Sequence, residues 1–579
     1  MLAQKEEQEQ LKNGVDKAKW KMVDKVAKVV TEAFARRFIV SVWNEPDVIA
    51  KAIVEKSTHL LKTIFARPDR DVTVMSLGFG GTGLAATMAM YSHAAYVDER
   101  FEANRYTAHI YDLDADRIGK CVANERPYCL VSFVGENGSS TPYRGRKNTN
   151  LHDQISQLQT EFVKGEKANG KTPVPSSVRH EDLAKEMKYP ILNFHAENCQ
   201  DLDFLRAFDD EGGATRPDFV FVATGDDYAN VRMANAITQK IVNTSLLQPQ
   251  RPMDVFVVIW DNTNNDLLSS GGGKWLDKYT VSIEDAKRNA GEILRLHIIG
   301  NNDRLYSAKN TIVFSEPIAF HNQYEEIADY DQKDDFADWC IRANIADADG
   351  TAVRTQENRN GLPKTEKDTA QRKIDSFNTH LYHTIARART EEKNDAGVYV
   401  TAMTAEAAAM DDASARNATL RKTAMPADIA ATTEESTARM LLWISKYTAR
   451  VNALPGYVDN LDQRLKYLAL DLWRKESNAM VALNCDLYHY LLADCFRLND
   501  EALPDGEKLA RYAQLASLEH QRWTRFHIAN GWVYSGQKEK FELVYQHGCI
   551  LPYAYVKEDT VLYDLSNVLM AWKYGKPTE

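Results

Sequence analysis

The sequence lacks three features, each of which would point to a membrane or a nucleic acid. It has no uninterrupted apolar run of the roughly 18–20 residues that a membrane-spanning helix needs. Its first residues are charged rather than arranged like a signal peptide. It also lacks excess positive charge, because its formal net charge is −11. We therefore expect a cytoplasmic protein without membrane insertion and without direct nucleic-acid binding.

The sequence is also short of the patterns that identify metal sites and common catalytic centres. Its seven cysteines are scattered and never form Cys-x-x-Cys, which argues against a zinc site and against a disulfide framework. It contains neither Gly-x-Ser-x-Gly nor His-Glu-x-x-His, and Gly271-Gly-Gly-Lys274 lacks the Ser or Thr of a Walker loop. His109 and His195 stand alone in apolar runs, so we expect them to be core histidines.

What the sequence does contain is a glycine-rich turn between an apolar run and a segment of helix formers. The run ends in Gly78-Phe-Gly-Gly-Thr-Gly83, and residues 84–90 favour a helix. This order is the setting in which Gly-x-Gly-x-x-Gly binds a dinucleotide. Gly78 would form the sharp turn, Gly80 would let a pyrophosphate approach, and Gly83 would let the helix pack on the sheet. The free N–H groups of the helix start would bind the phosphates.

A second strand with an acid at its end would complete such a unit. Residues 106–112 form an apolar run that ends in Asp112, with Asp114 two residues further. These carboxylates would accept hydrogen bonds from ribose hydroxyls. The spacing from Gly83 is longer than usual, so residues 98–104 would have to loop out. The alternative is that Asp112 only ends the strand or caps the next helix.

Three further apolar runs, at residues 218–225, 254–261 and 294–300, indicate strands that are buried on both faces of a parallel sheet. Strands that alternate with helical segments predict an α/β fold with a doubly wound, mostly parallel Rossmann sheet. Ligands of such sheets bind at the carboxyl ends of the strands. Thr224 to Asp226 would then lie beside the glycine turn, and they also suit the N-terminal cap of a helix.

Residues 71–315 resemble the nucleotide-binding domain of potassium-transport regulators, the RCK or KTN type that is also called TrkA-N. The resemblance rests on residues 78–83, on Tyr-Asp-Leu-Asp at 111–114 and on Val-Ala-Thr-Gly-Asp-Asp-Tyr-Ala-Asn at 222–230. It implies a regulatory domain that senses NAD(H), NADP(H) or another adenine or cyclic nucleotide. The residues that it assigns to the nucleotide are Gly78, Phe79, Gly80, Gly81, Thr82, Gly83, Asp112, Asp114, Thr224, Gly225 and Asp226. The sequence departs from the compact family pattern by a polar insertion at about residues 135–189, which would be a lid, a partner surface or a solvated loop.

The C-terminal region carries a second pattern. Residues 515–523 predict a helix in which Glu519 and Trp523 share one face. Asn530 and Gly531 are suited to end that helix, with Gly531 in a left-handed conformation.

The motif Glu-His-x-Arg-Trp followed by Asn-Gly-Trp-x-Tyr resembles the ryanodine-receptor repeat domain (RyR domain), a small helical module. The resemblance implies a module that senses a nucleotide-like ligand, and aromatic and guanidinium planes do stack on bases. The residues concerned are Glu519, His520, Arg522, Trp523, Asn530, Trp532 and Tyr534. The alternative is structural: the tryptophans would be core, and Glu519 would pair with Arg522 or Arg525 on the surface.

These patterns divide the chain into four parts. We predict N-terminal helices at residues 1–68, which would serve dimerisation or packing, and the Rossmann domain at residues 69–317. A polar helical linker would occupy residues 318–440, and a helical region at 441–579 would hold the RyR-like module at about residues 505–575. We therefore expect a homo-oligomer.

The combined prediction is a cytosolic nucleotide-sensing regulatory protein, in which the Rossmann domain is coupled to the RyR-like module. It would act in potassium-transport regulation, on a membrane transporter or effector supplied in trans, or in antiviral defence signalling. One alternative is an NAD(P)-dependent oxidoreductase, but Tyr143 and Lys147, which have the spacing of its catalytic pair, lie in the polar insertion. Because no acid–base group is otherwise apparent, the sequence favours a sensor over an enzyme. The last alternative is a structural or interaction protein with a vestigial Rossmann scaffold.

Overall fold

A computed structural model describes about half of the chain. The described residues are 45–98, 101–135, 138–143, 187–209, 216–245, 252–260, 294–300, 441, 444–445, 448, 470–534, 545–550, 553 and 558–575. The predictions for residues 1–44, for most of the polar insertion and for the linker lie outside these ranges.

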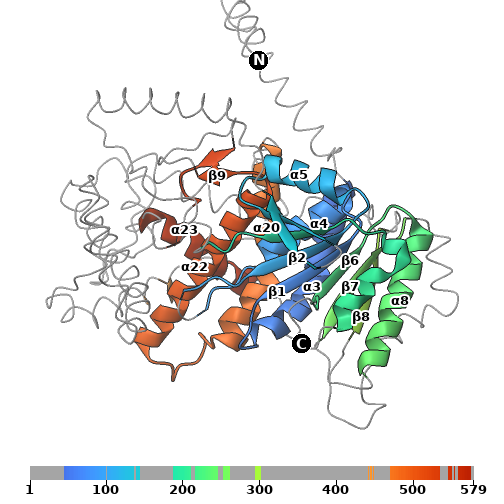
Figure 1. Ribbon diagram of the computed structural model, residues 1–579. Helices are drawn as coiled ribbons and strands as arrows, with labels where there is room; N and C mark the ends of the chain where they lie inside the picture. The colour runs from blue at the N-terminus through green and yellow to red at the C-terminus, as the bar shows by residue number, and fades with distance from the viewer. Residues whose placement is uncertain are drawn as a thin grey trace, which may run out of the picture.

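The described chain is built around an eight-stranded sheet in the order β4-β3-β5-β2-β1-β6-β7-β8 (Figure 1). The strands are β1 (Val72–Leu77), β2 (Tyr106–Tyr111), β3 (Leu130–Val134), β4 (Ser140–Tyr143), β5 (Ile191–His195), β6 (Phe219–Val222), β7 (Met253–Val258) and β8 (Leu294–Ile299). All neighbours are parallel except β3 and β4. The order from β5 to β8 is that of a doubly wound sheet whose direction of winding reverses between β1 and β6. The predicted α/β class with a mostly parallel sheet is confirmed.

Both faces of the sheet are buried, which explains the continuous apolar runs of its central strands. In β1, Val72 and Val74 belong to one core, whereas Met75 and Leu77 belong to the other. All four residues of β6 are buried. Side chains of a strand point alternately to its two faces, so a strand between two helical layers must be apolar throughout.

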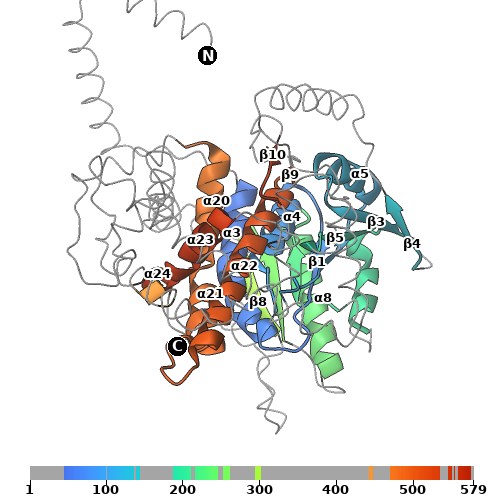
Figure 2. The ribbon, with the colours of Figure 1, turned by 90° about the vertical axis from the view of Figure 1, so that its left-hand side faces the viewer.

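Helices cover both faces. On one face lie α3 (Glu45–Phe65), α4 (Gly81–His93) and α5 (Ala115–Glu125), and on the other lie α8 (Asp227–Ser245) and the 3-10 turns η1 (Cys199–Asp201) and η2 (Asp203–Asp209). The C-terminal helices pack over α3 and α4, and Figure 2 turns this layer toward the viewer. They are α20 (Leu472–Leu483), α21 (Cys485–Tyr490), the π-helical η6 (Leu491–Cys495), α22 (Asp505–Ala529), α23 (Glu558–Leu569) and α24 (Ala571–Tyr574). A second, two-stranded sheet joins β9 (Val533–Tyr534) to β10 (Gln546–His547).

Five of the eight strands of the main sheet occur where apolar runs predict strands. Strands β1, β2, β6 and β8 form within the predicted runs, and β7 begins one residue before its run. Strands β3, β4 and β5 were not anticipated, and β5 completes the doubly wound half of the sheet beside β2. The hairpin of β3 and β4 begins the polar insertion, and β4 is exposed along most of its length. The polar composition of β4 gave no sign of a strand, whereas β3 is a short apolar segment that was overlooked.

One hydrophobic core joins the sheet to the C-terminal helices. Tyr91 of α4 and Tyr106 of β2 belong to the same cluster of buried residues as Leu515 of α22 and Leu565 of α23. The proposed division into a Rossmann domain and a C-terminal module stays a prediction, but the two parts share an interior. This shared core determines where the C-terminal motif lies.

Candidate nucleotide-binding site

The glycine turn follows β1 and has the geometry that its sequence predicts. Gly78 adopts a φ of +83°, and a Cβ atom there would lie 2.6 Å from the carbonyl oxygen of Ala223. A Cβ atom on Gly83 would lie 2.3 Å from the carbonyl oxygen of Gly78. These two positions therefore need glycine, the first for its conformation and the second for close packing of α4 on the turn.

Gly80 differs, because a Cβ atom there would meet nothing within 4 Å. Gly80 and Gly81 are exposed, and Pro46 of α3 lies 3.4 Å from the Cβ position of Gly81. The first helical hydrogen bond of α4 runs from the Leu84 N–H to the Gly80 oxygen, at 3.0 Å. The N–H groups of the three residues before Leu84 have no acceptor within the helix. They lie at the positive end of the helix dipole, so this open turn fits the pyrophosphate of a dinucleotide.

Asp112 follows β2 and connects the second strand to the glycine turn. Its Oδ2 atom accepts a hydrogen bond from the Phe79 N–H at 2.8 Å, and its Oδ1 atom accepts one from the Asp114 N–H at 2.8 Å. The carboxylate therefore joins the glycine turn to the residue that precedes α5, and the roles of a ribose contact and of a helix cap both stay predictions. Because each oxygen can accept a second hydrogen bond and Asp112 is only half-buried, a ribose hydroxyl could still reach it. Asp114 is exposed and pairs with Arg117, with 2.6 Å between Oδ2 and Nε.

Residues 224–226 follow β6 and form the third part of this edge. The Asp226 carboxylate accepts hydrogen bonds from the N–H groups of Tyr228 and Ala229 at 2.9 and 3.2 Å, which confirms the predicted helix cap. The N–H and the hydroxyl of Thr224 both donate to Oδ1 of Asn230, at 3.0 and 2.7 Å. Gly225 has a φ of +85° and open space at its Cβ position.

The structure brings the three predicted segments together at one edge of the sheet. A Cβ atom on Gly78 would lie 2.8 Å from the Cα atom of Thr224, so the glycine turn and the end of β6 are in contact. Asp112 is bonded to the turn from the other side. This edge includes the point between β1 and β6 at which the direction of winding reverses. Ligands of doubly wound sheets bind at such a point.

His109 and His195 form a pair on β2 and β5. Their Nδ1 and Nε2 atoms are 3.2 Å apart, and the ring of Tyr111 stacks on His195 at 4.2 Å. Burial lowers the pKa of His109 to about 4 and that of His195 to about 3, so both rings are neutral at pH 7. The two histidines were expected to be isolated, and their pairing was not predicted, because β5 was not among the predicted strands and its place beside β2 was unknown.

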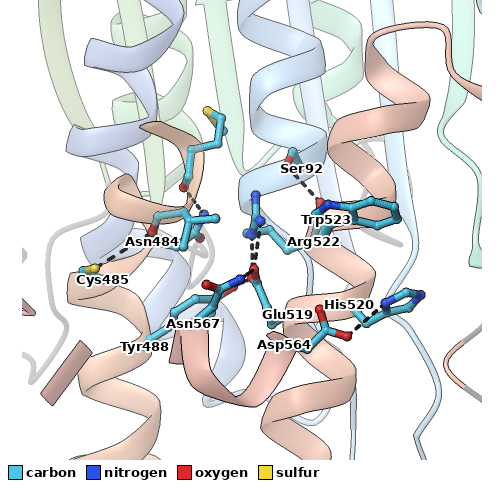
Figure 3. A network of polar contacts seen from close by, with 12 residues as sticks. Ser92, Asn484, Cys485, Tyr488, Glu519, His520, Arg522, Trp523, Asp564 and Asn567 are labelled. Carbon is cyan, nitrogen blue, oxygen red and sulfur yellow. Dashed lines mark hydrogen bonds and ion pairs between the residues drawn. The ribbon is translucent and has the colours of Figure 1, made fainter. Parts of the chain in front are cut away.

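The charged residues of the C-terminal motif form a buried cluster (Figure 3). Glu519 accepts hydrogen bonds from Nε and Nη2 of Arg522 at 2.6 and 2.9 Å and from Asn567 at 3.0 Å. The Tyr488 hydroxyl also donates to Glu519. Glu519 and Arg522 are 0% exposed, so the predicted ion pair forms in the interior and not on the surface.

His520 and Trp523 lie on another side of α22. Nδ1 of His520 is 3.1 Å from Oδ2 of Asp564, and burial raises the pKa of Asp564 to about 6 against the opposing effect of His520. Trp523 is half-buried among the rings of His520, His527 and His547, with centroid distances of 5.7, 4.0 and 4.8 Å.

The end of α22 follows the predicted pattern. The helix ends at Ala529, and Gly531 has a φ of +81°. Trp532 is core, with an exposure of 1%, whereas Asn530 is exposed and Tyr534 is half-buried. The Tyr534 N–H donates to the hydroxyl of Tyr128 at 3.0 Å. A ligand role for the seven residues of this motif stays a prediction, and Trp523, Asn530 and Tyr534 are the ones with exposed surface.

The described ranges contain neither a metal-binding cluster of side chains nor a membrane-spanning helix. There, no three His, Cys, Asp or Glu side chains are grouped as a metal ion requires. No helix in that part of the chain combines the length and the apolar character needed to cross a membrane.

No protein-family model, curated protein or solved structure matches this chain. The two family resemblances therefore rest on the sequence motifs alone and stay predictions.

Proposed function

We propose that this protein is a nucleotide-sensing regulatory protein whose glycine turn binds NAD(H) or NADP(H). The observation that carries the proposal is the contrast among the three glycines. Gly78 and Gly83 are closed in by the protein's own backbone, whereas Gly80 opens toward solvent at the first turn of α4, where helical N–H groups lack an acceptor within the helix. A turn that served only to reverse the chain would not need a glycine at the open position.

Each segment of the edge has a role in this proposal. The first-turn N–H groups of α4 bind the pyrophosphate, and Asp112 accepts hydrogen bonds from the ribose next to it. Gly225 lets the second half of the dinucleotide approach the end of β6, because its Cβ position is open. Cyclic and other adenine nucleotides offer phosphates to the same N–H groups.

A regulatory role is favoured over catalysis by what surrounds the turn. Asp112, Thr224 and Asp226 are each bonded to backbone or side-chain groups that shape the site. Tyr143, the one described member of the Tyr-x-x-x-Lys pair, lies on β4, and three strands separate β4 from β1. It is therefore remote from the nicotinamide that an oxidoreductase would have to position.

The output of the sensor follows from the family resemblances. In this proposal a homo-oligomer passes the nucleotide signal to a membrane transporter in potassium-transport regulation, or to an effector in antiviral defence. The partner acts in trans and contacts the C-terminal region, in which the RyR-like motif lies.

Calorimetric titration of the purified protein with NAD(H), NADP(H), ATP and cyclic nucleotides tests the proposal, together with mass spectrometry of any nucleotide that co-purifies. Gly80→Val should keep the fold, because Gly80 has a φ of −67° and no neighbouring atom within 4 Å. It should weaken binding by at least about tenfold, or about 1.4 kcal/mol, by blocking the approach of the phosphates. Unchanged affinity in a folded Gly80→Val variant would place the ligand elsewhere. Absence of heat with every nucleotide would favour the scaffold alternative, and steady turnover of a reducible substrate would favour the oxidoreductase.

A further inference from the structure

Helix α4 leads from the glycine turn into the interior of the molecule. Its first residue, Gly81, is exposed beside the turn, whereas Ser92 and His93 at its other end are each 1% exposed. At a rise of about 1.5 Å per residue the helix is roughly 20 Å long. Because its hydrogen-bonded turns make it stiff, a shift of its first turn displaces its last turn as well.

A buried cation from α22 holds the carboxyl end of α4. Arg525 donates hydrogen bonds from Nη1 to the carbonyl oxygens of Tyr91 and Ala94, at 3.4 and 3.3 Å, and from Nη2 to Oδ1 of Asn104, at 2.9 Å. Its guanidinium also lies 4.9 Å from the centroid of the Tyr91 ring. Arg525 is 0% exposed, and each of these acceptors is uncharged. The negative end of the α4 dipole therefore provides much of the compensation for its charge.

A second contact ties the same end of α4 to the buried cluster (Figure 3). The Ser92 hydroxyl donates to the carbonyl oxygen of Arg522 at 3.2 Å. The Arg522 side chain binds Glu519, which also accepts hydrogen bonds from Tyr488 of α21 and Asn567 of α23. A displacement of this end of α4 is therefore passed to three C-terminal helices.

The contact between α4 and α22 leaves some polar atoms unused. Nη1 of Arg522 and Nε of Arg525 are buried, and neither has a hydrogen-bond partner within the described part of the chain. A buried polar atom without a partner favours any rearrangement that supplies one. The contact thus combines specific anchors with buried polar atoms that only another arrangement could satisfy.

We propose that occupancy of the glycine turn is transmitted along α4 to α22, with Arg525 and Ser92 as positioning residues of the nucleotide site. The inference rests on the proposed function and specifies how that site is regulated. Phosphates bound at the amino end of α4 fix its axis and favour the arrangement in which Arg525 reaches Tyr91 and Ala94. Because coupling is reciprocal, a partner that holds α22 in this arrangement raises the nucleotide affinity by the same factor.

Hydrogen exchange of the full-length protein, with and without saturating NADH, tests the transmission. Amide exchange in residues 505–529 should slow on binding by a factor of about 5 or more, the lower end of typical coupling between sites. The effect should vanish in Gly80→Val. Ser92→Ala removes a single hydroxyl and should reduce the slowing while circular dichroism stays that of the parent protein. Arg525→Lys keeps the charge but cannot reach both carbonyl oxygens, so it should also weaken NADH binding in calorimetry.

Arg511→Lys is the matched control, since Arg511 lies on the same helix but binds Phe496 and Glu507 and not α4. It should change neither NADH affinity nor the exchange response. If NADH binds with the expected heat and slows exchange only around residues 78–83, 112 and 224–226, the coupling through α4 is wrong and the proposed function stands. If NADH binds nowhere, the proposed function fails and the coupling with it.

Discussion

Gly531 is needed both for its backbone conformation and for a close contact with α5. It ends α22 in a left-handed conformation, with a φ of +81°, and a Cβ atom there would lie 2.7 Å from the Glu125 carbonyl oxygen of the neighbouring α5. Gly531→Ala should therefore lower the free energy of unfolding by about 1–3 kcal/mol, because it adds both backbone strain and a clash. Urea denaturation measures the change.

Gly506 near the start of the same helix is the control for this prediction. It has no positive φ, and its Cβ position meets nothing within 4 Å. Gly506→Ala should be neutral or should stabilise the protein by up to about 1 kcal/mol, because alanine favours a helix. Equal losses of stability at both positions would show that neither the left-handed conformation of Gly531 nor its contact with Glu125 is important.

The position of the Asp112 carboxylate allows a prediction of which dinucleotide binds more tightly. A 2′-phosphate on the adenosine ribose would meet the Asp112 carboxylate, while the nearby Arg117 is paired with Asp114. We therefore expect NADH to bind at least about tenfold more tightly than NADPH, a difference of about 1.4 kcal/mol. Parallel calorimetric titrations provide the comparison. Tighter binding of NADPH would mean that Asp112 does not face the ribose.

At the scale of elements, the ion pair between Glu519 and Arg522 lies buried where α22 packs against its neighbours. Glu519→Gln would leave the Arg522 charge buried without a counter-charge and should cost about 3–5 kcal/mol of stability. The double variant Glu519→Gln with Arg522→Met removes both charges and should recover part of that loss. Urea denaturation of both variants tests this difference. A double variant as unstable as the sum of its single variants would show that the pair does not act as a unit.

Several interpretations of single residues changed once their elements were packed. Glu519 and Arg522 stand three positions apart on a polar stretch of helix, a spacing typical of a surface pair. Their burial follows from the position of α22 between α4 and α23, which no local pattern in the sequence reveals. His109 and His195 likewise became a pair only because β5 inserts between β2 and β3.

At the scale of the whole molecule, three histidines whose pKa values are lowered by burial predict acid sensitivity. Burial lowers the pKa of His93 to about 3, of His109 to about 4 and of His195 to about 3. The unfolded chain binds their protons below about pH 6.5 and the folded chain does not, so stability falls as the pH drops below that value. Asp564, whose pKa is raised to about 6, works in the opposite sense between its unfolded value of 3.8 and 6.

Together, the three histidines and Asp564 take up about two protons when the protein unfolds near pH 5. Stability should therefore fall by about 3 kcal/mol per pH unit there. Urea denaturation between pH 5 and pH 8 measures this slope. His109→Gln should reduce the slope by the contribution of about one proton. A flat profile would contradict the burial of these rings.

The local patterns of the sequence determined a large part of the fold and of the candidate site. Unbroken apolar runs become strands wherever helices cover both faces of a sheet, as in β1, β6 and β7. The positions of Gly78, Gly83, Asp226 and Gly531 were also predictable, because turns and caps depend on residues a few positions apart.

Only the tertiary structure decided the contacts between segments that are distant in the chain. The bond from the Phe79 N–H to Asp112, the His109–His195 pair and the hold of Arg525 on the end of α4 all depend on which elements become neighbours. Neighbours are selected by the burial of whole faces, a free energy spread over many side chains, and not by any one motif. The sequence by itself therefore located a glycine turn of the kind that binds nucleotides, whereas the fold showed that Arg525 of α22 holds the other end of the helix that this turn begins.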